Sequence, residues 1–432
     1  MSTAPRRASA ASAAVAVEEL LLESRCLDVP PGADPTERVV HERLVRRHEP
    51  GRTVEEVSVD GQPVSRRGVP HLGLPSEVHV VDGQPAPFPK AEFIERGGEL
   101  ARRIRGTLPG EIGGALREVL IHTQLRRRVS TYRNDAGSRV RQVRDWSVLG
   151  VQVRFGNGVT DRWGLTVCEG FLGWRADALV ERVCRDVTDM RPQPTGGPRP
   201  GRYRLQLAPD AAAVFWHEAI GHALEADFAQ PEELRPGRRV AAEGWQVVDD
   251  PTTPEGQGAY AVVDEGIAAR TTPLIEDGRI ARLLTDRVTA LRVSAPSTGN
   301  GRYGTGRIRP RMSNLIARGP SAEIDASAPT LLLSRPVSGG YDGRAFVLRC
   351  WSGQAEDRAG RMRPVGPVTV TGAPGSFLAA LRGCIGDPEW QRAGALCNKG
   401  GSNGLLVGVN TPGLVFESVH LDESAHVRLD VP

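Results

Sequence analysis

The chain has 432 residues, of which 39% are hydrophobic, so it is long enough to form two domains with separate cores. Its net charge is only +3, and its basic residues are mainly arginines scattered among carboxylates, which argues against a nucleic-acid-binding surface. No apolar run approaches the roughly 20 residues of a membrane-spanning helix, so we expect neither nucleic acid nor a membrane as a partner.

Cysteine usage and the amino terminus both indicate a reducing compartment. Six cysteines are spread over the whole chain instead of forming a compact disulfide framework. The apolar stretch Ala10–Val17 is short and is followed at once by acidic residues, unlike a signal peptide. The sequence therefore predicts a cytoplasmic protein.

The first half of the chain is predicted to be an α+β domain over residues 15–190, after a disordered segment at residues 1–14. Apolar alternation with two turn signals predicts an antiparallel meander over Glu118–Val167. The turns are placed at Asn134–Gly137 and Gly156–Gly158. Helical patterns are predicted at Val15–Ser24 (amphipathic), Glu92–Arg105 and Ala176–Met190.

A run rich in proline and glycine at residues 191–202 predicts a linker, followed by a second domain over residues 203–432. That domain opens with a strand at Tyr203–Leu207 and a helix, and then alternates short apolar segments with Gly, Asp and Pro. The predicted fold class is α+β: an N-terminal α/β-meander domain plus a C-terminal, mainly antiparallel and barrel-like β domain that carries one catalytic helix.

The helix of the second domain contains His217, Glu218 and His222 within six residues. Zinc proteases commonly space two histidines at i and i+4, which brings both rings to one helical face. The spacing here is i and i+5, which would turn the rings roughly 140° apart on an ideal helix. A π-type turn restores their alignment, and Gly221 is the residue most able to permit it. The motif therefore predicts a locally widened helix.

A catalytic metal needs a third protein ligand, and Cys397 in a Gly-rich loop is a candidate. Glu225, one helical turn beyond His222, is a rival ligand. If no metal binds, the alternative is a helix at the boundary of a sheet, in which each of the two histidines forms a hydrogen bond.

The chain resembles the TldD/PmbA family of metallopeptidases, and specifically its metal-bearing TldD-like branch. The His217–Asp227 run is the hallmark of that branch, and the resemblance covers nearly all of residues 203–420 and, more loosely, residues 20–190. Further blocks follow in the family's order: Val247–Asp250, Asp264–Gly266, Leu284–Arg287, Pro296–Gly301, Pro310–Asn314, Cys397–Gly400 and Leu406–Pro412.

The resemblance implies that His217, His222 and Cys397 bind Zn²⁺ and that Glu218 deprotonates the attacking water. Two neutral imidazoles and one thiolate leave one net positive charge, which is enough to acidify water and to polarise a peptide carbonyl. A thiolate donates more charge to the ion than a third histidine would, so the metal-bound water is expected to be less acidic. The general base Glu218 therefore becomes more necessary.

Four other residues are weaker candidates. We favour Glu225 or Asp227 as a partner that holds an imidazole N–H, with a plain salt bridge or helix-end charge as the alternative. The resemblance also implies that Arg311 and Asn314 contact substrate backbone. One departure from the family lies in the Cys397 loop, where Asn398, Gly400 and Ser402 replace the usual glycine, acidic residue and glutamine. This puts substrate contacts and loop shape in doubt more than metal binding.

The resemblance further implies a peptidase whose metal lies in a chamber formed with a second subunit, so that unfolded or extended peptides enter. Strand addition to a sheet edge would give low sequence selectivity. The expected partner is a PmbA/TldE-like subunit without the motif, a homodimer is the alternative, and maturation of ribosomally made, modified peptides is the expected role. Two alternative functions are a non-catalytic peptide-binding subunit and a metal-dependent oxidoreductase.

Overall fold

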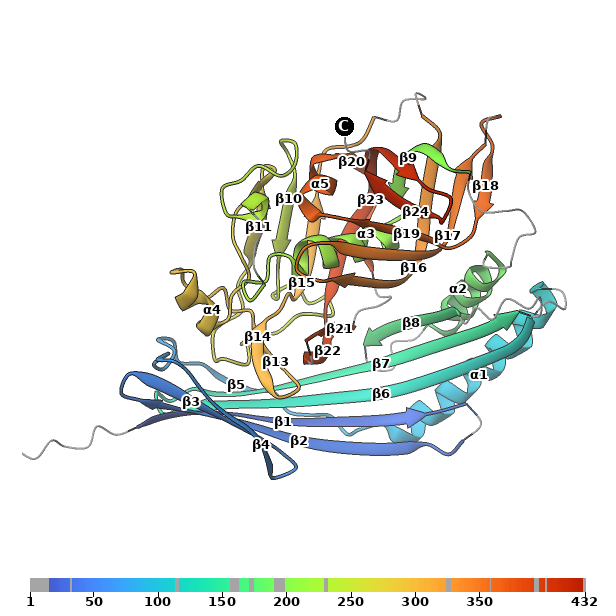
Figure 1. Ribbon diagram of the computed structural model, residues 1–432. Helices are drawn as coiled ribbons and strands as arrows, with labels where there is room; N and C mark the ends of the chain where they lie inside the picture. The colour runs from blue at the N-terminus through green and yellow to red at the C-terminus, as the bar shows by residue number, and fades with distance from the viewer. Residues whose placement is uncertain are drawn as a thin grey trace, which may run out of the picture.

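A computed structural model describes residues 15–31, 33–112, 116–155, 163–170, 175–189, 199–228, 232–323, 328–357, 359–391, 396–400 and 402–429. Within these residues each half of the chain forms one large sheet, and the helices are few (Figure 1). The predicted α+β class is therefore confirmed.

The N-terminal sheet runs in the order β4-β3-β2-β1-β6-β7-β5, with β8 beside β7. All of its pairings are antiparallel except that of β5 with β7. The predicted meander is confirmed as β6, β7 and β8, and its first turn lies at Asn134–Gly137; the predicted turn at Gly156–Gly158 falls outside the described residues. The strands are β1 (Ala16–Val29), β2 (Thr36–Glu49), β3 (Arg52–Val59), β4 (Gln62–Pro70), β5 (Val80–Asp82), β6 (Leu116–Asn134), β7 (Arg139–Phe155) and β8 (Trp163–Gly170).

The helix predicted at Val15–Ser24 is wrong, because this segment begins strand β1. Strand β1 is hydrogen-bonded to β2 on one side and to β6 on the other. Leu20 and Leu22 are buried while Leu21 between them is exposed, which is the two-residue period of a strand. Pairing on both sides decides the conformation over the helical propensity of the Leu and Glu residues.

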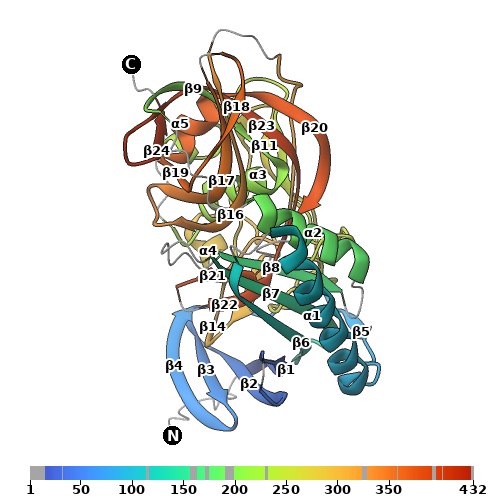
Figure 2. The ribbon, with the colours of Figure 1, turned by 90° about the vertical axis from the view of Figure 1, so that its right-hand side faces the viewer.

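Two long helices cover one face of the N-terminal sheet (Figure 2). Helices α1 (Lys90–Ile112) and α2 (Ala176–Asp189) contain the predicted ones at Glu92–Arg105 and Ala176–Met190, apart from residue 190, which is not described. Their apolar side chains form one cluster with β6 and β7, and this leaves the other sheet face to the C-terminal half. The cluster includes Leu100, Ile104, Ile121, Leu149 and Val183.

The C-terminal sheet closes on itself, because β9 pairs with both β16 and β23. The closed path is β23-β24-β19-β17-β16-β9, antiparallel except at β19–β24 and β9–β16, so the barrel-like prediction is confirmed. Strands β15, β10, β11 and β12 extend the sheet beyond β23. The path consists of β9 (Gly201–Leu207), β16 (Thr330–Tyr341), β17 (Phe346–Glu356), β19 (Val368–Gly372), β23 (Gly408–Leu421) and β24 (His426–Leu429).

The remaining elements complete this half around a buried helix, α3 (Pro209–Trp216), which packs against β16 and β23. Two hairpins, β13–β14 and β21–β22, extend from the C-terminal half toward the N-terminal sheet (Figure 1). The other elements are β10 (Gln246–Asp249), β11 (Thr272–Glu276), β12 (Arg279–Ile280), β13 (Gly301–Gly304), β14 (Arg307–Pro310), β15 (Asn314–Arg318), β18 (Met362–Val365), β20 (Leu381–Gln391), β21 (Leu396–Lys399), β22 (Ser402–Leu406), α4 (Arg287–Arg292), α5 (Pro374–Ala379), the π-helical turn η1 (His217–His222) and the 3₁₀ turn η2 (Glu232–Leu234).

The N-terminal sheet ends before the predicted linker at residues 191–202, and the C-terminal sheet begins with β9 at Gly201, within the last two residues of that linker. Residues 1–14 and most of that linker lie outside the described residues, so the disordered start and the domain boundaries stay predictions. In the part of the chain that the structure describes, no helix is long and apolar enough to cross a membrane.

Candidate metal centre

Helix α3 runs without a break into the π-helical turn η1, so the predicted local widening of the helix is confirmed. Pro209 starts α3, where its fixed φ and missing N–H cost nothing. Trp216 ends α3 fully buried, and its indole N–H donates to Thr411 Oγ1 at 3.0 Å. The histidines therefore project from a helix that the core holds firmly in place.

Gly221 is required for a reason other than backbone freedom. Its φ is not positive, but a Cβ at this position would lie 2.4 Å from Sδ of Met312 and 3.1 Å from Cδ1 of Leu315. Both neighbours are buried. The glycine thus lets the wide turn pack directly against strand β15 and the segment before it.

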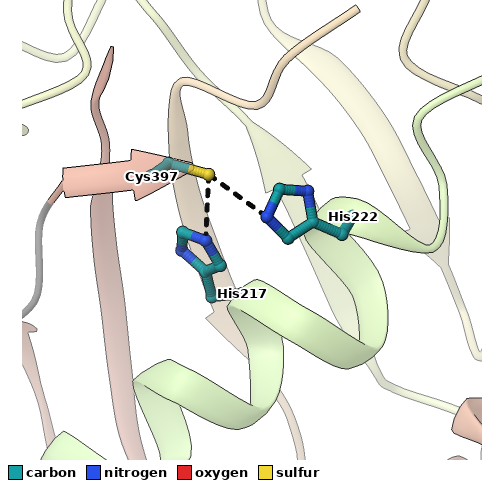
Figure 3. Close-up of side chains that lie close together, drawn as sticks. All are labelled: His217, His222 and Cys397. Atoms are coloured by element: carbon teal, nitrogen blue, oxygen red, sulfur yellow. Dashed lines mark hydrogen bonds between the residues drawn. The ribbon is translucent and has the colours of Figure 1, made fainter. Parts of the chain in front are cut away.

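The structure brings His217, His222 and Cys397 together, although about 180 residues separate the cysteine from the histidines (Figure 3). Sγ of Cys397 lies 3.1 Å from Nε2 of His217 and 3.2 Å from Nε2 of His222. The two imidazole rings lie 4.9 Å apart, centroid to centroid. Among the described residues, this is the one cluster of His, Cys, Asp and Glu donors that could hold a metal ion.

The donor set fits a zinc ion. Imidazole nitrogen and thiolate sulfur at normal zinc distances and tetrahedral angles lie roughly 3.3–3.6 Å from one another, close to the separations here. Burial alone would raise the pKa of the Cys397 thiol, but His217, His222 and Arg311 hold it well below its ordinary value. The thiolate, the form that binds metals, is therefore the favoured state.

Cys397 reaches the helix because its hairpin rests on the N-terminal sheet. Strand β21, which contains Cys397, pairs with β22. Leu406 at the end of β22 packs against Trp146 and Val148 of β7. The position of the sulfur is thus set by contacts between the two halves of the chain.

Glu225 lies on the far side of His222 from the sulfur. Its Oε2 is 2.9 Å from Nδ1 of His222, so Nε2 of the ring faces Cys397. The carboxylate is fully buried, and it also accepts hydrogen bonds from Met312 N at 3.0 Å and Lys399 Nζ at 2.6 Å. Burial would raise the pKa of Glu225, but Lys399 and His222 together hold it well below its usual range.

Lys399 was not among the predicted site residues. Its ammonium contacts Glu225 and Asp227 and lies 4.2 Å from the centroid of the Phe228 ring. Asp227 also accepts from Arg309 at 3.1 Å, so it contacts Lys399 and Arg309 and not a histidine. The sequence did hold an indication that Lys399 is special, because it is one of just two lysines among the 55 lysines and arginines.

Glu218 is buried in the π-helical turn beside strand β16. Gly339 of β16 makes room for it, since a Cβ there would lie 2.7 Å from Oε1 of Glu218. Burial raises the pKa of the Glu218 carboxyl against the opposing effect of His217 and His222. A carboxylate with a raised pKa is a better proton acceptor.

Arg311 and Asn314 are both fully buried. Nε of Arg311 lies 3.8 Å from Oε1 of Glu225, which places a second cation beside the Lys399 cluster. Asn314 accepts from Gly258 N at 2.7 Å and donates to the carbonyl of Asp250 at 3.0 Å. Contact of either side chain with a substrate stays a prediction.

The chain also resembles known metallopeptidases in sequence. Residues 200–422 match the model of the PmbA/TldA metallopeptidase C-terminal domain. A metalloprotease of Synechocystis sp. is 32% identical over 228 residues, which are 50% of this chain and 49% of that protein. A zinc metalloprotease TldD homolog of Saccharolobus solfataricus is 34% identical over 108 residues, 24% of each chain.

The fold is also that of a solved structure, TldE from Thermococcus kodakarensis, with a TM-score of 0.69 and 16% sequence identity. That likeness covers 94% of this chain and 96% of TldE. The sequence matches are shorter: the chain spans about half the length of the Synechocystis metalloprotease and of a TldD homolog from Buchnera aphidicola.

Proposed function

Because this chain belongs to the PmbA/TldD metallopeptidase family, we propose that it is a zinc-dependent peptidase that hydrolyses unfolded or extended peptides. One observation carries the proposal: two imidazole nitrogens and a thiolate sulfur converge within hydrogen-bonding distance, and a buried carboxylate follows the first histidine directly. Three protein donors leave a coordination position open, as in catalytic zinc sites.

His217, His222 and Cys397 would hold the ion, and a zinc ion there would supply a Lewis acid that polarises the scissile carbonyl and acidifies water. Glu218 takes a proton from the attacking water as the C–O bond forms, and it then delivers that proton to the leaving amine nitrogen as the C–N bond breaks.

Glu225 is proposed to orient His222, and Lys399 to orient Glu225. The Glu225 carboxylate accepts from Nδ1 of His222, which fixes the tautomer that leaves Nε2 free as a donor to the ion. Asp227 holds Lys399 from its other side. These contacts support Glu225 as an orienting group instead of the rival metal ligand.

We propose extended peptides as substrates, including precursors of ribosomally made, modified peptides, and a PmbA/TldE-like subunit as partner. The support is family membership and a fold shared with TldE. Strand addition at an exposed sheet edge would bind the main chain and give low side-chain selectivity. Cys26, Cys184, Cys350, Cys384 and Cys397 are all free thiols, which supports a reducing compartment such as the cytoplasm.

The decisive experiment is Glu218→Gln, tested on an unfolded peptide with and without a co-expressed PmbA-like partner. Cleavage is expected to fall about 10²- to 10⁴-fold while bound zinc stays unchanged. The matched control is Glu276→Gln, which alters an exposed residue at the end of strand β11. Undiminished activity in Glu218→Gln would contradict the proposal, and iron or copper in place of zinc without peptide cleavage would favour an oxidoreductase.

The ligand set is tested by Cys397→Ala, with Cys384→Ala, a partly buried cysteine outside the cluster, as control. We expect zinc bound by the purified protein to fall from near stoichiometric to a small fraction in Cys397→Ala alone. Full zinc occupancy would remove Cys397 from the ligand set and return Glu225 to it.

A further inference from the structure

A small cavity lies between the N-terminal sheet and the hairpin that contains Cys397. Its volume is about 40 Å³, enough for a few water molecules or one small charged group. Strands β6 and β7 supply one wall, and the β13 strand and the β21–β22 hairpin supply the other. The lining residues that matter here are Arg128, Arg144, Trp146, Asp264, Arg302 and Leu405.

The cavity gathers three guanidinium groups around one carboxylate. Asp264 already accepts from Arg128 at 3.2 Å and from the backbone N–H of Tyr303 at 2.7 Å. The cavity lining therefore holds one negative charge against three positive charges, and the carboxylate is hydrogen-bonded to Arg128 alone of the three arginines.

Arg144 and Arg302 bond to neutral groups. Arg144 donates to the carbonyl of Gln257 at 2.7 Å, and Arg302 donates to the carbonyls of Met312 at 2.6 Å and Leu406 at 2.8 Å. In the described part of the chain neither arginine forms an ion pair. Burial and the neighbouring Arg302 and Arg128 lower the pKa of Arg144 to about 9, and the opposing effect of Asp264 is too small to cancel this shift.

Trp146 adds a donor without a partner. Its side chain is about nine-tenths buried, it lines the cavity, and its Nε1–H has no hydrogen-bond partner among the described residues. A buried indole N–H normally donates a hydrogen bond, so this one indicates an acceptor supplied by a bound molecule. Excess positive charge and an unused donor together favour an anion.

The cavity lies beside the candidate metal centre. Leu405 lines it and is also the cross-strand partner of Cys397, so their backbones are about 5 Å apart. The distance between a group bound in the cavity and the sulfur of Cys397 could therefore be spanned by a few residues of extended peptide.

We propose that this cavity binds the C-terminal carboxylate of a peptide substrate. The flat, two-oxygen carboxylate matches the planar donors of Arg144 and Arg302, and Trp146 supplies a further N–H. The proposal rests on the proposed peptidase function and adds a preference to it: the enzyme recognises peptides by their free C-terminus and cleaves a few residues before it.

The test compares two fluorescently labelled peptides of one sequence, one with a free C-terminus and one amidated. Equilibrium binding is measured on zinc-loaded full-length Glu218→Gln, where cleavage does not interfere. The free acid is expected to bind at least about tenfold tighter than the amide, as charge-assisted hydrogen bonds predict. Equal affinities would overturn the proposal.

Variants of the cavity residues test whether the preference for the free acid arises in this cavity. Arg144→Gln and Trp146→Phe are each expected to reduce the preference for the free acid, whereas Arg139→Gln, exposed on the opposite face of β7, is expected to keep it. Trp146→Phe removes an unpaired N–H and keeps the ring, so a normal melting temperature is expected alongside the lost preference. A preference that survives both cavity variants would place the carboxylate elsewhere and overturn the proposal.

Small probes and turnover separate the remaining outcomes. Stabilisation by acetate but not acetamide, without any preference between the peptides, would mean that the cavity takes a free anion and would overturn the assignment to a peptide terminus. Wild-type cleavage of both peptides at equal kcat/KM would refute this inference alone. Preferential binding of the free acid without cleavage would refute the hydrolytic function and leave the carboxylate site standing.

Discussion

Nδ1 of His222 lies 2.9 Å from Oε2 of Glu225, a fully buried carboxylate that also accepts from Lys399 and from the backbone of Met312. Three donors on one carboxylate leave it little freedom, so it fixes the orientation of the imidazole. The ring nitrogen that faces Cys397 is therefore chosen by residues that do not touch the candidate metal position themselves.

Replacement of Glu225 tests this orientation. Glu225→Gln keeps the shape of the side chain but loses its charge, so we expect zinc affinity to fall about 10- to 100-fold. Competition with a chromophoric chelator gives the dissociation constant. Asp227→Asn, which alters a residue that contacts Lys399 and Arg309 but no histidine, is expected to have a smaller effect. An unchanged zinc affinity in Glu225→Gln would show that His222 needs no such partner.

Lys399 is expected to stabilise the fold through its buried carboxylate partners. Lys399→Met leaves Glu225 and Asp227 without this cation and should lower the free energy of unfolding by about 3 kcal/mol, measured by denaturant titration. Lys399→Arg keeps the charge but not the compact shape, so an intermediate loss is expected. Lys90→Met, which removes a half-exposed pair with Glu37, should cost less than about 1 kcal/mol. Equal losses at positions 399 and 90 would contradict this account.

Gly221 is predicted to be intolerant of a methyl group because of Met312. Gly221→Ala places a Cβ within 2.4 Å of Sδ of Met312, and we expect a loss of about 1–3 kcal/mol in unfolding free energy. In a double-mutant cycle, Met312→Ala should remove part of that loss, with a coupling of about 1 kcal/mol or more. Additive effects would mean that the π-helical turn, and not the contact with Met312, requires the glycine.

Glu18 predicts how stability responds to acid. Burial would raise the pKa of this carboxyl, but His48, Arg46 and Arg287 lower it to about 2. Because the unfolded chain binds this proton more readily, the contribution of Glu18 is complete above about pH 4.5 and is lost as the pH falls through 2. Arg287 belongs to the C-terminal half, so the ion pair joins the two halves of the chain.

The variant for this test is Glu18→Gln. At pH 7 it should lower the free energy of unfolding by about 3 kcal/mol, and its melting temperature should change less than that of the wild type between pH 4.5 and pH 2. Glu23→Gln, a much more exposed glutamate on the same strand, is the control. Parallel pH profiles for wild type and Glu18→Gln would contradict the assignment.

The sequence by itself determined the features that depend on local spacing. The i, i+5 separation of His217 and His222 predicted the π-helical turn, because only a wider turn lets both rings face one point. Alternation of apolar residues predicted the meander of β6 and β7, since a strand buried on one face has a period of two. The order of the motifs along the chain, which resembles that of the TldD/PmbA family, identified Cys397 as the candidate third ligand.

Only the tertiary structure decided the features that depend on partners distant in the chain. Residues 15–24 form a strand because β2 and β6 flank them, which no local pattern reveals. The approach of Cys397 to the histidines depends on Leu406 packing on β7, and the grouping of Arg144 with Arg302 depends on the contact between the two halves. Spacing along the chain fixes which side chains share a face, whereas the distance between faces is set by how whole sheets pack.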